Sequence, residues 1–189
     1  MNNLKLSAHP QNGLNDAAVK KLKDLRNILL LSFSQVERGA RLKKNTYSKI
    51  ESGSILSNLN TIGSLINFYG IEYHDFFNFE KELPDEKTLR RKIEAYHKRH
   101  NSSDYKVIYE QPDLIEFIEF RLLKTSLFAD WVTAEQLVTY CKGNHKYDYI
   151  VSSARNTLNN AVKKGWLVVD DKAKPKRYKR KDEGNKSRP

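Results

Sequence analysis

Hydrophobic residues recur every three or four positions between residues 16 and 80, which predicts a series of short helices. The pattern is most informative at residues 32–53, where two short helical stretches are separated by a tight turn. Val36 and Ala40 stand four positions apart and therefore share one face of the first stretch. We expect this face to be buried against the other helices.

The second stretch, residues 43–51, has a short apolar face formed by Tyr47 and Ile50, and Gly53 is expected to end the helix. The other side chains point away from this face and can donate hydrogen bonds to phosphate oxygens and base edges. They are Lys43, Lys44, Asn45, Ser48 and Lys49. This arrangement is typical of a helix-turn-helix whose second helix enters the major groove of DNA.

Residues with capping side chains indicate where the helices should begin. They are Asp16, Ser32 or Ser34, Asn58, Thr133 and Asp148. Thr133 is followed three positions later by Gln136, which is the spacing of a capping box. Gly70 and Gly165 stand where two further helices are expected to end.

Residues 81–112 are predicted to be a helical connector, because Pro84 opens a new helix that runs to about His100. This helix carries a thin apolar stripe among basic residues. The stripe consists of Leu89, Ile93 and Tyr96. It can dock on one domain or pair with a second copy of the chain, so a homodimer through this helix is an open alternative. A short strand is expected at residues 105–109.

The hydrophobic pattern of residues 113–181 predicts a second module of mixed α and β structure. Its expected elements are a core helix at 113–127, a helix after Thr133, a helix after Asp148, a strand at 166–169 and a returning basic strand around Tyr178. Three helices followed by strand, turn and strand is the order of a winged helix.

The charge of the chain narrows the class of partner. The 189 residues carry a formal net charge of +11 and a pI near 9.6, which points to a polyanion. Seven of the ten residues from 172 to 181 are basic, which suits contact with phosphates or a minor groove.

The remaining composition bears on the environment of the protein. A single cysteine excludes an internal disulfide framework and fits a reducing cytoplasm. No signal peptide and no apolar run of membrane-spanning length is expected, so no membrane partner is predicted. Both ends of the given sequence are polar. Residues 1–15 are predicted to be a flexible arm, and residues 182–189 a disordered tail.

Four N-terminal segments together carry a resemblance to a known family. They are L-K-D-L-R at 22–26, the turn and second helix at 40–51, I-E-S-G at 50–53 and S-N-L-N-T-I-G-S-L-I-N-F-Y-G-I at 57–71. Through them, residues 19–77 resemble the lambda-repressor/Cro-type (XRE-like) helix-turn-helix domain. The resemblance implies a five-helix bundle at residues 16–80 with its third helix in the groove. It also implies a structural ion pair between Arg26 and Glu51.

The resemblance also implies which side chains touch DNA. They are Lys43, Lys44, Asn45, Thr46, Ser48 and Lys49. Three positions depart from the family pattern, with Glu37 in place of a small residue, Arg41 in place of glycine and Phe33 in place of a phosphate-binding glutamine. The residues expected to take over that phosphate contact are Ser32, Ser34 and Gln35.

The segment V-K-K-G-W-L-V-V at 162–169 resembles the end of the recognition helix and the first wing strand of winged-helix domains. This likeness covers residues 113–181. The helix residues then expected to contact DNA are Ser152, Ser153, Arg155 and Asn156. The wing would contribute Lys174, Lys176, Arg177 and Lys179. The alternative interpretation of the basic run is a solvated tail.

No group of residues indicates catalysis, a metal or a cofactor. His97 and His100 lie three apart on a helix, but no cysteine or carboxylate set completes a metal site. Cys141 and His145 lie four apart without the third group that nucleophilic catalysis needs. The sequence therefore argues against an enzyme and against a bound cofactor.

The sequence thus predicts a mainly α-helical cytoplasmic protein that binds double-stranded DNA sequence-specifically. The expected role is that of a bacterial or phage-type transcriptional regulator, acting as a repressor. One alternative is an antitoxin or adaptor whose helix-turn-helix has drifted away from DNA, an interpretation that the three departures motivate. Another is an initiator of replication or of a mobile element, because winged helices also serve at origins.

Overall fold

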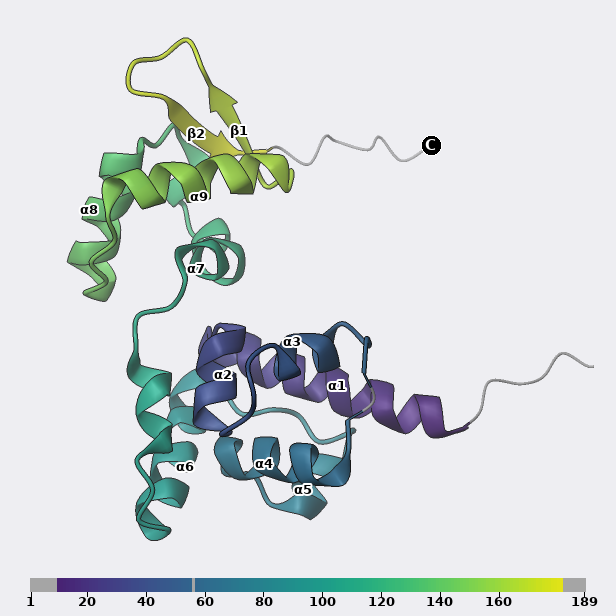
Figure 1. Ribbon diagram of the computed structural model, residues 1–189. Helices are drawn as coiled ribbons and strands as arrows, with labels where there is room; N and C mark the ends of the chain where they lie inside the picture. The colour runs from purple at the N-terminus through teal and green to yellow at the C-terminus, as the bar shows by residue number, and fades with distance from the viewer. Residues whose placement is uncertain (1–9, 56, 182–189) are drawn as a thin grey trace, which may run out of the picture. The chain divides into compact units, whose positions relative to one another are not determined.

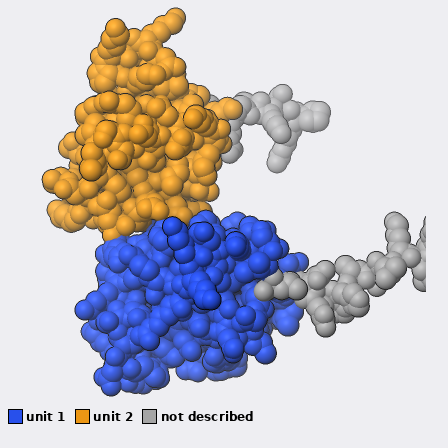
Figure 2. Space-filling view, in the orientation of Figure 1, with its two compact units in different colours: residues 1–110 blue, residues 111–189 orange. Residues whose placement is uncertain are grey.

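The computed structural model is mainly helical and has a small two-stranded antiparallel sheet near its C-terminus (Figure 1). It describes residues 10–55 and 57–181. Two compact units divide the chain between Glu110 and Gln111, and Figure 2 colours them separately. Within the described ranges, no helix combines the length and the apolar composition that crossing a membrane requires.

In the described part of unit 1, residues 1–110, every regular element is a helix. Its elements are α1 (Pro10–Leu29), α2 (Phe33–Gly39), α3 (Thr46–Glu51), α4 (Leu59–Tyr69), α5 (Tyr73–Phe77), α6 (Glu86–Arg99) and the 3-10 helix η1 (Asp104–Tyr109). Because α1 starts at Pro10, the predicted arm at 1–15 is wrong for residues 10–15. The rest of that arm and the predicted tail at 182–189 lie outside the described residues.

One hydrophobic core joins all the helices of unit 1. Its largest members include Leu22, Leu25, Leu29, Tyr47, Ile50, Leu65, Ile66, Phe68, Tyr69 and Phe76. The faces predicted from periodicity are confirmed, because Val36, Ala40, Tyr47 and Ile50 are all buried. This core fixes α3 against both α1 and α2.

Several helices begin at the capping residue that the sequence predicted. The side chains that accept the first free backbone N–H groups belong to Ser32, Asn58 and Thr133. Asp85 caps α6 in the same way, where the sequence predicted that a helix opens. Two predicted caps are wrong. Asp16 lies inside α1, and Asp148 pairs with Lys142 instead of capping the following helix.

Glycine ends α4 as expected, for two physical reasons. Gly70 has φ 58°, a left-handed conformation that glycine adopts without a steric penalty. A Cβ atom at Gly70 would also stand 2.8 Å from the Cβ of Tyr96 on α6. Glycine therefore both stops the helix and allows α6 to approach it closely.

The connector predicted for residues 81–112 belongs largely to unit 1. Leu89 and Ile93 of α6 are buried in the core of that unit, and the Tyr96 hydroxyl donates to Asn67 of α4. The stripe predicted for a homodimer is therefore used within the chain. The strand expected at 105–109 is wrong, because this segment forms η1, and no strand lies in the described part of unit 1 to pair with it.

Unit 2, residues 111–189, combines helices with the sheet. Its elements are α7 (Leu114–Phe120), the 3-10 helices η2 (Leu122–Lys124) and η3 (Leu127–Ala129), α8 (Ala134–His145), α9 (Val151–Lys163), β1 (Leu167–Asp170) and β2 (Arg177–Arg180). The single helix predicted for 113–127 breaks at Arg121, whose φ and ψ leave the helical region. The break lets both Leu122 and Phe128 turn into the core.

The sheet of unit 2 lies beside α9 (Figure 1). β1 and β2 pair antiparallel, with Leu167 opposite Arg180. Val132, just before α8, exchanges two backbone hydrogen bonds of 2.8 Å with Tyr178 and so adds a third, one-residue strand on the other edge of β2. The β-branched and aromatic run Trp131–Thr133 was the sequence signal for this strand, and we did not predict it.

Candidate nucleic-acid interface

The polar segment that follows α2 is exposed and lies on a buried frame. Its members with described side chains are Lys43, Lys44, Asn45 and Lys49, which are exposed, and Thr46 and Ser48, which are half-buried. These six residues are called the 43–49 surface below. Tyr47 and Ile50 on the opposite face of α3 are buried in the core. The division between the two faces agrees with the division predicted from the sequence.

The helix predicted over residues 43–51 is shorter in the structure. α3 begins at Thr46, and Asn45 before it has φ 63°, a left-handed conformation that cannot continue an α-helix. Asparagine adopts this conformation more readily than most residues. Lys43, Lys44 and Asn45 therefore lie on the turn, and only the rest of the 43–49 surface lies on the helix.

Glu37 caps α3 from the preceding helix. Its Oε2 accepts a hydrogen bond of 3.0 Å from the backbone N–H of Asn45, and its Oε1 accepts one of 2.9 Å from the N–H of Tyr47. Asn45 makes no side-chain cap of its own. The position where the family has a small residue thus holds a buried carboxylate that satisfies the start of α3. No local sequence signal pointed to this contact.

Replacing Glu37 by alanine is expected to lower the free energy of unfolding by about 2–3 kcal/mol, since two N–H groups lose a charged acceptor. Glu37→Gln should recover part of the loss, because an amide oxygen can accept one of the two bonds. Urea unfolding followed by circular dichroism measures both. The matched control is Glu80→Ala on an exposed glutamate, which should change stability by less than about 0.5 kcal/mol. Equal effects of the two alanine variants would contradict the capping role.

Arg41 occupies the turn position where the family has glycine, and its backbone is left-handed with φ 55°. Its guanidinium Nη2 lies 2.9 Å from Asp104 Oδ2 of η1. Asp104 Oδ2 also accepts the Ser102 hydroxyl at 2.8 Å. Burial raises the pKa of the Asp104 carboxyl, but the hydrogen bonds from Ser102 and Arg41 and the Arg41 charge outweigh it, so this pKa lies below its usual value.

η1 therefore supports the turn after α2, although η1 lies outside the residues 19–77 that the resemblance covers. Gln35 Nε2 donates to the Val107 carbonyl at 3.5 Å, and Arg38 pairs with Glu110 just after η1. With Arg41 and Asp104, these contacts hold α2 and its turn against η1. The strained backbone at Arg41 is thus accompanied by an ion pair that glycine could not make.

Two residues predicted to contact phosphate instead cap the start of α2. Ser32 and Gln35 are buried and form a reciprocal capping box: the Ser32 N–H donates to Gln35 Oε1 at 2.8 Å, and the Gln35 N–H donates to Ser32 Oγ at 3.3 Å. Both side chains are therefore occupied within the fold, which does not favour the predicted phosphate contact. Ser34 is exposed and is the only one of the three that keeps an outward position.

The ion pair implied between Arg26 and Glu51 is confirmed. Arg26 Nε and Nη2 bond the two Glu51 carboxylate oxygens at 2.9 and 3.0 Å, and Nη1 bonds the Leu31 carbonyl at 2.9 Å. The Phe33 ring lies 4.7 Å from the guanidinium carbon. Phe33, at the position of the family glutamine, therefore covers this pair. The pair ties the end of α3 to α1.

In unit 2, the predicted residues of α9 lie on its exposed side. Ser152, Ser153, Arg155 and Asn156 are all exposed, and Arg155 pairs with Glu135 of α8 at 3.0 Å. Asn159 of α9 is half-buried and accepts a hydrogen bond of 3.0 Å from the buried Tyr178 hydroxyl.

The basic wing between β1 and β2 is partly neutralised by its own carboxylates. Arg177 bonds Asp170 at 2.7 Å, and this hydrogen bond is the main reason that the pKa of the Asp170 carboxyl is lowered. Lys176 pairs with Asp171. Lys174 is exposed and has no ion pair among the described residues, while Lys179 is half-buried.

Cys141 of α8 is buried and free of any disulfide. Burial raises the pKa of the Cys141 thiol to about 11, which keeps the thiol protonated and inert. The described part of the chain contains no cluster of three or more metal-binding side chains.

Comparisons with protein-family models, with curated proteins and with solved structures gave no match.

Proposed function

We propose that the protein is a sequence-specific double-stranded DNA-binding transcriptional regulator that reads the major groove with the 43–49 surface. The observation that carries the proposal is the exposed 43–49 surface on a two-helix frame whose opposite face is entirely buried. α2, the turn and α3 form the helix-turn-helix of a repressor-type bundle in this interpretation. Glu37, the η1 contacts and the Arg26–Glu51 pair would hold it rigid, as specific recognition requires.

In this proposal the side chains of the 43–49 surface divide the work. Lys44 and Lys49 can donate to guanine O6 and N7, and the Asn45 amide can make two bonds to adenine. Lys43 is placed for a phosphate, which fixes register and carries no sequence information. Bound protein would then block or guide polymerase by occupancy, so repression is the expected outcome.

Unit 2 would be a winged helix and a second reader of the same DNA. Its three helices, the Val132 strand, β1 and β2 follow the element order of that fold. α9 presents Ser152, Ser153 and Asn156 outward, and the wing presents Lys174. Two readers in one chain would allow a long asymmetric site to be bound by a monomer. This suits a chain whose α6 stripe is already packed internally.

The alternative of an antitoxin or adaptor was motivated by the three departures from the family pattern, and this support is now weaker. Glu37 caps α3, Arg41 pairs with Asp104 and Phe33 covers the Arg26–Glu51 pair, so all three departures from the family pattern have structural roles in this chain. An initiator of replication would also bind DNA, so it differs from a regulator only in where its binding sites lie. A map of the bound sites distinguishes the two, because a regulator binds at promoters and an initiator at repeat arrays.

Asn45→Gly tests the reading role directly. Glycine accommodates φ 63° without strain, so the variant removes the amide and leaves the turn in place. We expect affinity for the preferred duplex, selected from a random pool, to fall by about 1–3 kcal/mol and specificity to relax at one base pair. Fluorescence anisotropy with the preferred duplex and a random duplex measures both effects.

Asn101→Gly is the matched control, because Asn101 is also exposed and left-handed, with φ 52°, but lies after α6. It should leave the preference between duplexes unchanged. An equal loss on preferred and random duplexes for Asn45→Gly would contradict the assignment of Asn45 as a base reader.

A further inference from the structure

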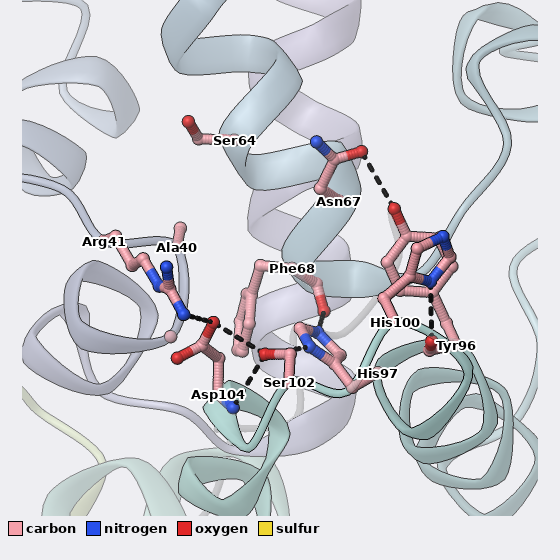
Figure 3. Close-up of a pocket in the computed structure, with 11 residues that line it drawn as sticks. Ala40, Arg41, Ser64, Asn67, Phe68, Tyr96, His97, His100, Ser102 and Asp104 are labelled. Carbon is pink, nitrogen blue, oxygen red and sulfur yellow. Dashed lines mark hydrogen bonds and ion pairs between the residues drawn. The ribbon is translucent and has the colours of Figure 1, made fainter.

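A cleft of about 360 Å³ lies beside the turn of unit 1, between that turn, α4 and the end of α6. In Figure 3, Arg41 and Asp104 lie on one side of the cleft, and Tyr96 and His100 lie on the other. The Phe68 ring lies between them, and Ser64 and Asn67 of α4 form a third side. The volume is within the range of small-molecule sites in proteins.

Two side-chain oxygens of this cleft already accept hydrogen bonds. Asp104 Oδ2 already takes both the Ser102 hydroxyl and Arg41. Asn67 Oδ1 accepts the Tyr96 hydroxyl at 3.2 Å. A cationic ligand would therefore have to compete with Arg41 for a carboxylate that is already paired.

Several hydrogen-bond donors that border the cleft, by contrast, have N–H or O–H groups without a partner among the described residues. Arg41 pairs with Asp104 through Nη2, so other N–H groups of the guanidinium remain available. The Asn67 amide NH₂ group and the Ser64 hydroxyl have no hydrogen-bond partner among the described residues. Three donors from two separate segments thus border one cleft, and N–H and O–H donors are the groups that bind a phosphate or a carboxylate.

We propose that this cleft binds a small oxyanion, the phosphate or carboxylate group of a small molecule, through Arg41, Asn67 and Ser64. The anion would bridge the turn to α4 while the Arg41–Asp104 pair stays in place. Because Arg41 lies two residues before the 43–49 surface, the occupant would hold the start of α3 more firmly. The cleft is then an effector site, a consequence that rests on the proposed DNA-binding function.

Titration of the full chain with inorganic phosphate at constant ionic strength, followed by isothermal calorimetry and amide NMR shifts, tests binding. We expect saturable binding in the wild type and a loss of about tenfold or more in both Arg41→Gly and Asn67→Asp. Glycine relieves the left-handed strain at residue 41, and aspartate keeps the acceptor for Tyr96, so both variants should fold. Parallel titration with succinate shows whether phosphate or carboxylate is preferred.

The matched control is Arg91→Gln, which removes one exposed cation of α6 outside the cleft and changes the net charge by the same amount. It should bind phosphate within about twofold of the wild type, because long-range attraction between exposed charges is screened. If Arg91→Gln weakens binding as much as Arg41→Gly, or if neither anion binds saturably, the site is overturned.

Hydrogen exchange separates the effector role from DNA binding. Saturating phosphate should slow exchange of the Leu42, Asn45 and Tyr47 amides in the wild type and not in Asn67→Asp. Unchanged exchange with saturable binding would overturn the link to the turn. Slowed exchange in a protein that binds no duplex would leave the site standing and refute the DNA-binding proposal. Where both hold, phosphate should raise duplex affinity, and duplex should raise phosphate affinity by the same factor.

Discussion

Arg26→Ala is expected to lower the free energy of unfolding of unit 1 by about 3–5 kcal/mol, the largest stability loss of any single substitution considered. The reason is the environment of the partner that remains. The side chains of Arg26 and Glu51 are 6% and 7% exposed, so the variant leaves a carboxylate buried without its cation. The Leu31 carbonyl also loses its donor. The end of α3 is then no longer tied to α1.

Chemical denaturation measured by circular dichroism and by Tyr and Trp fluorescence checks this prediction. The matched control is Lys20→Ala, which breaks an exposed α1 pair with Asp24 and should cost less than about 0.5 kcal/mol. A second test replaces both Arg26 and Glu51 by leucine. The double variant should be clearly more stable than Arg26→Ala, because it leaves no charge buried. A loss under about 1 kcal/mol for Arg26→Ala would refute the importance of the pair.

Much of unit 1 could be predicted from the sequence because its signals are local or periodic. Val36, Ala40, Tyr47 and Ile50 are separated by helical spacings, and a buried helix face follows directly from such spacing. The Ser32 and Asn58 caps, like the Thr133 cap in unit 2, depend on a side chain reaching an N–H two or three residues away. The Arg26–Glu51 pair, 25 residues apart in the chain, came from the resemblance alone.

The candidate site was predicted only in part, because its frame depends on contacts between distant segments. Glu37 reaches Tyr47 across the turn, and Arg41 reaches Asp104 more than sixty residues later. Neither partner is encoded in a local pattern, so both residues seemed to be departures that weaken the resemblance. Ser32 was expected to contact phosphate because the sequence shows that the residue is polar. The sequence does not show that its side chain is buried.

Helix ends and strand order were predicted least well. The left-handed Asn45 shortens α3 by three residues, and no propensity rule distinguishes an asparagine that caps from one that continues a helix. Asp148 satisfies the composition of a cap, but it pairs with Lys142. The short strand at Val132 depends on Tyr178, 46 residues later, and an isolated bridge has no periodicity of its own.

Affinity for a preferred duplex is expected to fall by about a thousandfold or more between about 50 and 200 mM salt, if the chain neutralises about six to ten phosphates. The net charge of +11 and the exposed lysines of both units are the physical reason. Anisotropy titrations at a series of salt concentrations give the slope of log K against log salt. A slope near zero would exclude phosphate contact and with it the proposed function.

Variants of two wing lysines test how much the wing contributes to the slope of log K against log salt. These two lysines form no ion pair with the wing carboxylates Asp170 and Asp171. Lys172 and Lys174 are exposed and have no ion pair among the described residues, whereas Lys176 and Arg177 are held by Asp171 and Asp170. Replacing both lysines by glutamine should reduce the magnitude of the slope by about two, since each phosphate contact contributes about 0.9. As a control, Lys20→Gln combined with Arg91→Gln removes the same charge from α1 and α6 and should leave the slope nearly unchanged. Equal reductions in both variants would mean that the slope reflects net charge, and that the wing does not touch the duplex.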